Sequence, residues 1–98
     1  MNIREKVTNI CNDVEGINAI ICNNTLHNGV LRLSLTEEDI LETLISSIKS
    51  NISDIDNIDD DEFDLYIDDI KKFIGNIDNV VKRSRSNKFL INKLYGVI

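Results

Sequence analysis

The sequence predicts a small α+β domain, in which an N-terminal helix and a β-hairpin are followed by two or three helices packed on a small antiparallel sheet (α-β-β-α-α-α). Apolar residues recur at helical spacing over residues 2–15, an Asn-Gly pair divides an alternating stretch over 17–35, and helical spacing returns from residue 37 onwards. A chain of 98 residues has room for one domain, so we expect residues 1–98 to form a single unit.

The first helix is expected over residues 2–15. Its apolar positions follow the helical period and form one stripe, Ile3, Val7, Ile10 and Val14. Gly16 stands directly after this stripe, where glycine commonly ends a helix. We therefore expect the helix to stop there.

The hairpin is expected over residues 17–35. Asn28-Gly29 suits a type I′ turn, which needs positive φ at both central residues. That turn would set Leu26 opposite Leu31 and Cys22 opposite Leu35, with the apolar side chains on one face of the hairpin and most polar ones on the other. Because a lone hairpin is marginal in water, helices must cover its apolar face.

A second helix is expected over residues 37–52, with Thr36 as its N-cap and Asp39 completing a weak capping box. Acidic residues in its first turn suit the positive end of the helix dipole. Its predicted core face consists of Ile40, Leu41, Leu44, Ile45, Ile48 and Ile52.

A third helix is expected from about residue 60 to 84, followed by a short final helix over 87–96 that Ser86-Asn87 would cap. The third helix carries a heptad seam of apolar residues, Phe63, Ile67, Ile70, Ile74, Ile77 and Val81. This seam has two interpretations, packing within the domain or a helical contact in a homodimer. The final helix would turn Phe89, Leu90, Leu94 and Val97 inward.

Charge is segregated along the second half of the chain. Residues 70–98 hold seven bases and one acid, and residues 53–69 hold no base and nine acids, Asp54, Asp56, Asp59, Asp60, Asp61, Glu62, Asp64, Asp68 and Asp69. One interpretation is that acids at the start of a helix and bases at its end stabilise the helix dipole. A second is that the nine acids form a partner-binding surface for a protein with a basic patch. A specific calcium loop is disfavoured, because Ile58 stands at the fifth loop position and no glycine follows at the sixth.

Composition restricts the classes of function. The net charge of −6 disfavours direct nucleic-acid or membrane binding. No signal peptide, long apolar run or disulfide framework is visible, which predicts a cytoplasmic protein with reduced thiols. His27 is the one histidine and lies on the opposite predicted hairpin face from Cys22, so no catalytic pair is expected. We expect no cofactor, no metal site and no enzyme activity.

Three functional hypotheses follow. The first is an acidic inhibitor that blocks a host nucleic-acid enzyme such as a CRISPR or restriction nuclease in the host cytoplasm. The 17 Ile and 13 Asn indicate coding from an AT-rich genome, such as that of a low-GC bacterium, its phage or a large DNA virus, and we expect this inhibitor to be encoded by a phage or virus. The second is an assembly subunit that forms homodimers through the 63–81 seam. The third is a small regulator that contacts nucleic acid through Lys82, Arg83, Arg85 and Lys88.

Overall fold

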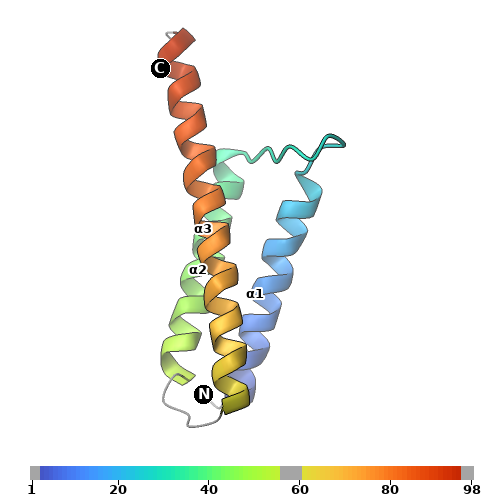
Figure 1. Cartoon of the computed structure of the whole chain (residues 1–98), viewed down its shortest axis with the longest axis vertical. Coiled ribbons are helices and arrows are strands. Elements are labelled where there is room, and N and C mark those ends of the chain that lie inside the picture. The colour runs from blue at the N-terminus through green and yellow to red at the C-terminus, as the bar shows by residue number, and fades with distance from the viewer. Residues whose placement is uncertain (1–2, 56–60, 96–98) are drawn as a thin grey trace.

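The fold is a bundle of three helices, and the predicted α+β class is wrong. The computed structural model describes residues 3–55 and 61–95, without the side chains of 61–63, 91, 92, 94 and 95. The helices are α1 (Ile3–Asn23), α2 (Leu35–Ile55) and α3 (Asp61–Tyr95). They run up, down and up along a long axis of 53 Å (Figure 1). Over the described residues the only β pairing is one isolated bridge.

Helix α1 continues through the segment predicted as the first strand. Ile17 is fully buried and Ile20 and Ile21 are half-buried, so these residues extend the apolar stripe of Ile10 along the helix. Gly16 does not end the helix: a Cβ built there would lie 3.4 Å from Leu44 Cδ1, so the glycine marks a close approach of α1 to α2. Packing against α2 therefore outweighs the strand preference of an isoleucine-rich segment.

The loop over residues 24–34 keeps only a remnant of the predicted hairpin. Gly29 has a φ of 81°, but no described residue other than glycine has positive φ, so a type I′ turn is excluded. The Gly29 N–H donates to the Leu26 carbonyl at 2.9 Å and the Leu26 N–H donates to the Val30 carbonyl at 2.8 Å. Thr25, and not Leu26, pairs with Leu31. Because a shift of one residue reverses the faces, the predicted apolar face of the hairpin does not form.

Helix α2 begins two residues earlier than predicted. Ser34 Oγ accepts a hydrogen bond from the Glu37 N–H at 3.1 Å, and Glu37 Oε1 accepts one from the Ser34 N–H at 2.8 Å. This is a reciprocal capping box, and its hydrogen bonds lower the pKa of the Glu37 carboxyl. Ser34 is therefore the N-cap, and the predicted Thr36–Asp39 box is wrong.

Helix α3 is one continuous helix, so the predicted break at Ser86-Asn87 is wrong. Its 35 residues correspond to roughly 52 Å at the usual rise of 1.5 Å per residue, and its C-terminal end projects past the other helices (Figure 1). Phe89 and Leu90 on this projection are 64% and 54% exposed, against the predicted inward orientation. The side chain of Leu94, and Val97, lie outside the described residues.

The core runs along the bundle between the three helices. Most predicted core positions of α2 and α3 are confirmed, while Ile40 is 44% exposed and Phe63 lies outside the described side chains. The buried apolar residues are Ile10, Ile17, Leu33, Leu41, Ile45, Ile48, Ile52, Ile55, Ile67, Ile74, Ile77 and Val81.

Candidate functional site

The described acids of the predicted partner-binding surface lie at one end of the bundle, where α2 finishes and α3 begins (Figure 1). Asp54, Asp64, Asp68 and Asp69 are all exposed, and we call these four residues the acidic end. Asp56, Asp59 and Asp60 lie outside the described residues, as do the side chains of Asp61 and Glu62, which start α3.

Most of the acidic end lacks a partner within the described part of the chain. Asp54 Oδ2 lies 2.5 Å from Lys6 Nζ of α1. Asp64, Asp68 and Asp69 form no ion pair with any described residue. Asp64 and Asp68 stand four residues apart on α3, where two like charges disfavour a helix by a few tenths of a kcal/mol. Three carboxylates are thus available to an external cation.

We call Lys82, Arg83, Arg85 and Lys88 the basic stretch of α3, and three of these residues pair with acids that lie outside the acidic segment 53–69. Lys82 pairs with Asp78 one turn earlier, at 3.0 Å. Arg85 reaches α2, where it pairs with Asp39 at 2.8 Å and donates a hydrogen bond to Glu42. The hydrogen bond to Glu42 raises the pKa of the Arg85 guanidinium.

Glu38, on the first turns of α2, is the centre of this contact and was not singled out from the sequence. It is the one charged side chain that is fully buried among the described residues. Its Oε1 accepts hydrogen bonds from Lys88 and, at 3.2 Å, from Ser84. Its Oε2 lies 3.6 Å from Arg85 Nε and has no hydrogen-bond partner. The sequence gives one sign that Glu38 is buried, its position between apolar residues on one side of a helix. This sign does not identify Glu38's partners on α3, which lie about fifty residues later in the chain.

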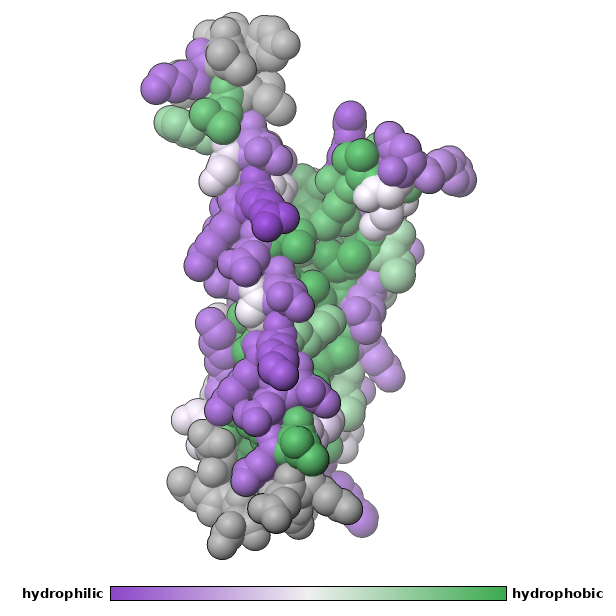
Figure 2. Space-filling model, viewed as in Figure 1, coloured by the Kyte–Doolittle hydropathy of each residue, from purple (hydrophilic) through white to green (hydrophobic). Residues whose placement is uncertain are grey.

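The heptad seam of α3 faces the interior of its own chain. Ile67, Ile74, Ile77 and Val81 are buried, and Ile70 is half-buried. These side chains are already covered by the other helices. The outer face of α3 is instead polar along most of its length (Figure 2).

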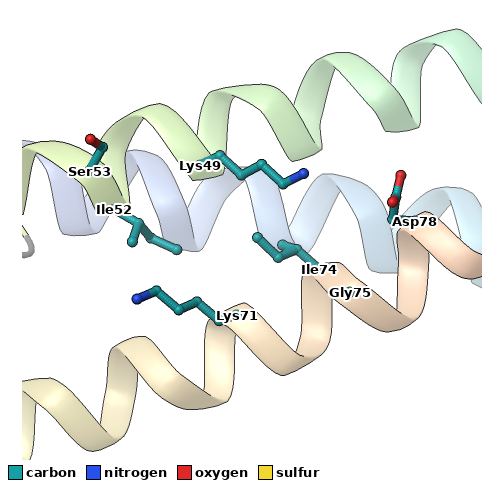
Figure 3. Close-up of a pocket in the computed structure, with 7 residues that line it drawn as sticks. All are labelled: Lys49, Ile52, Ser53, Lys71, Ile74, Gly75 and Asp78. Carbon is teal, nitrogen blue, oxygen red and sulfur yellow. The ribbon is translucent and has the colours of Figure 1, made fainter.

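A groove of about 410 Å³ opens between α2 and α3. Figure 3 shows Ile52 and Ile74 pointing toward each other across it, with Lys49 and Lys71 beside them. Gly75 and Asp78 continue the α3 wall. The groove therefore combines an apolar floor with charges of both signs.

The two residues considered for catalysis, His27 and Cys22, are both exposed. His27 lies in the loop, and Cys22 lies near the end of α1. Cys11 of α1 lies 3.5 Å from the Tyr66 hydroxyl of α3. Among the residues described, no group of three or more His, Cys, Asp or Glu side chains is arranged to hold a metal ion. None of the three helices, as far as they are described, has the length and apolar content needed to cross a membrane.

Comparisons with protein-family models, curated proteins and solved structures gave no match to this chain.

Proposed function

We propose that this chain is a non-enzymatic binding protein whose acidic end docks on the basic surface of another protein. The observation that supports the proposal is that basic residues of α3 are paired within the bundle, whereas most carboxylates of the acidic end are not. Arg85 and Lys88 are paired within the bundle, whereas Asp64, Asp68 and Asp69 form no ion pair with the described residues.

The geometry of the acidic end suits such a partner. Three of its four carboxylates stand on α3, so the spacing of these three is set before binding and little ordering is needed on association. The net charge of −6 adds a long-range attraction that speeds encounter with a basic surface and weakens with salt. A basic nucleic-acid groove, as in a CRISPR or restriction nuclease, is one surface of this kind.

Two other observations weaken the nucleic-acid and assembly-subunit hypotheses. Two cations of the basic stretch, Arg85 and Lys88, are neutralised by carboxylates of α2, which reduces the charge left for phosphate. The seam of Ile67, Ile74 and Ile77 is buried in its own chain and is not exposed for a second copy.

The test is a capture experiment with a matched control. Immobilised wild-type protein is exposed to a lysate of a low-GC bacterium at low salt, and bound proteins are eluted with a salt gradient. Asp69→Lys removes a carboxylate of the acidic end, and Glu15→Lys makes the same change of charge on an exposed position of α1.

We expect a basic partner that the wild type and Glu15→Lys retain and that Asp69→Lys loses at lower salt. Adding Asp64→Lys to Asp69→Lys should lower the eluting salt concentration further. Equal retention by all variants would show that the acidic end is not the binding surface.

A further inference from the structure

We infer that the hollow between α3 and the loop over residues 24–34 binds a phosphate monoester carried on an apolar group. The hollow consists of two adjoining cavities of about 430 and 230 Å³, which share Leu31, Ser84 and Asn87 in their walls. It lies on the C-terminal half of α3, whereas most of the acidic end lies at the start of that helix (Figure 1). The inferred site is therefore separate from the proposed function.

One wall of the hollow is a stripe along α3. Val80, Ser84 and Asn87 stand at steps of four and three, which keeps them on one side of the helix, and Arg83 lies beside them. Val80 packs against the core and keeps part of its surface exposed. This wall therefore offers an apolar surface and polar side chains together.

The other wall is the loop segment 30–33. A hydrogen bond from Lys88 Nζ to the Leu33 carbonyl holds this segment against α3. Leu31, like Val80, packs against the core and is half-buried. The side chain of Arg32 stands next to it on the wall of the larger cavity. Each wall thus carries one apolar side chain that faces the core and one arginine.

Three hydrogen-bond donors of the hollow have no partner in the described part of the chain. The side chains of Arg32, Arg83 and Asn87 are exposed, and none of them forms an ion pair or a hydrogen bond with a described residue. A guanidinium group donates only, so an occupant of the hollow must supply acceptors. The arginines therefore favour an anion.

The chemistry of the walls selects the class of anion. Each guanidinium can bind two oxygens of a phosphate at once, and two arginines match the charge of about −1.5 to −2 that a phosphate monoester carries at pH 7. Glu38 lies behind Ser84, but Lys88 and Arg85 offset its charge. Leu31 and Val80 offer the apolar part of the ligand a surface that a free phosphate ion does not use.

The first experiment is an NMR titration of the full chain with phenyl phosphate at low salt. Saturable shifts of the methyl groups of Leu31 and Val80 should locate the ligand in the hollow. Inorganic phosphate and phenol, which each keep one half of the probe, should bind at least tenfold more weakly, and benzoate should also bind more weakly because it carries a single charge. Shifts confined to other residues, no saturable shift, or benzoate binding of equal strength would overturn the inference.

Arginine variants test the anion contacts. Arg32→Gln and Arg83→Gln should each weaken phenyl phosphate binding about tenfold, because each removes charge-assisted hydrogen bonds. Arg4→Gln makes the same change at an exposed position of α1 and should leave binding unchanged. Equal weakening in all three variants would show that the protein attracts the anion only through its overall charge.

A carboxylate placed in the hollow supplies a check that a folding defect cannot imitate. Asn87→Glu should abolish phenyl phosphate binding, whereas Ser86→Glu, at the exposed neighbouring position outside the hollow, should retain it. Thermal unfolding should show wild-type stability for both variants, since the Asn87 side chain makes no hydrogen bond with a described residue. Binding that survives in Asn87→Glu would contradict the site.

Discussion

Lys88 donates a hydrogen bond from Nζ to the buried Oε1 of Glu38, which joins residues 50 positions apart. The same ammonium group donates to the Leu33 carbonyl at the end of the loop. One lysine therefore holds together the second half of α3, the start of α2 and the loop that precedes it. Ser84 and Arg85, one turn earlier on α3, contact α2 as well.

Removing the Lys88 ammonium group should destabilise the protein strongly. Lys88→Met leaves the buried carboxylate of Glu38 with Arg85, at 3.6 Å, as its remaining cation. We expect the free energy of unfolding to fall by about 2–3 kcal/mol, below the range for wholly buried pairs because Lys88 is partly exposed and Arg85 remains. Lys82→Met on the same helix breaks the exposed pair with Asp78 and should cost less than about 0.5 kcal/mol. Urea unfolding at low protein concentration measures both, and equal losses would disprove the role assigned to Glu38.

The double variant Glu38→Met/Lys88→Met tests whether Lys88→Met destabilises the protein because it leaves the Glu38 carboxylate buried. Replacing both charges with apolar side chains leaves no buried carboxylate, so this variant should be more stable than Lys88→Met alone. A double variant that is less stable than Lys88→Met would indicate that Glu38 holds Ser84 and Arg85 independently of Lys88.

The capping box of α2 predicts that replacing Ser34 lowers the stability of the protein more than replacing Thr36. Ser34→Ala removes the acceptor for the Glu37 N–H and should lower the free energy of unfolding by about 1 kcal/mol. Thr36→Ala lies inside the helix and should change stability by less than about 0.5 kcal/mol. Thermal unfolding followed by circular dichroism measures both, and a larger effect at Thr36 would restore the N-cap predicted from the sequence.

The close approach at Gly16 predicts opposite effects of a small and a large side chain. Gly16→Ala places its Cβ at 3.4 Å from Leu44, an ordinary contact distance, and should stabilise α1 by about 0.5–1 kcal/mol. Gly16→Leu cannot fit between the helices and should cost about 1–3 kcal/mol. Chemical denaturation distinguishes them, and stabilisation by leucine would mean that α1 and α2 are not closely packed at this point.

Tyr66 predicts a loss of stability at alkaline pH. Burial, together with the hydrogen bond to Cys11, raises the pKa of Tyr66 from 10.0 to about 12. The unfolded chain therefore loses this proton first, and the stabilisation present below pH 10.0 is lost as the pH rises toward about 12.

An ultraviolet titration of tyrosinate should show a step near pH 12 for Tyr66. Tyr66→Phe should remove the high-pH step and flatten the dependence of stability on pH above 10.0. A single tyrosinate step near the ordinary pKa in the wild type would contradict the burial of Tyr66.

The amino-acid sequence by itself determined where the apolar stripes of the helices lie. The stripe of Ile45, Ile48 and Ile52 is buried as its spacing predicted. The spacing also identified the seam of Ile67, Ile74 and Val81, but left open whether it packs within the chain or against a second copy; the structure buries it within the chain. The true cap of α2 was also readable, because Ser34-Leu35-Thr36-Glu37 matches a capping box. These features depend on neighbours within one helical turn, so local pattern is sufficient to find them.

Only the tertiary structure decided whether residues 17–23 form a helix or a strand, and which acids pair with the basic stretch. An isoleucine-rich segment suits a strand or a helix locally, and burial of Ile17 in the core selected the helix. Likewise, the sequence showed that Arg85 and Lys88 follow an acidic segment, but not that they would fold back on Glu38 and Glu42. Burial and charge pairing between residues distant in the chain depend on how whole helices pack, and no local window of sequence contains that information.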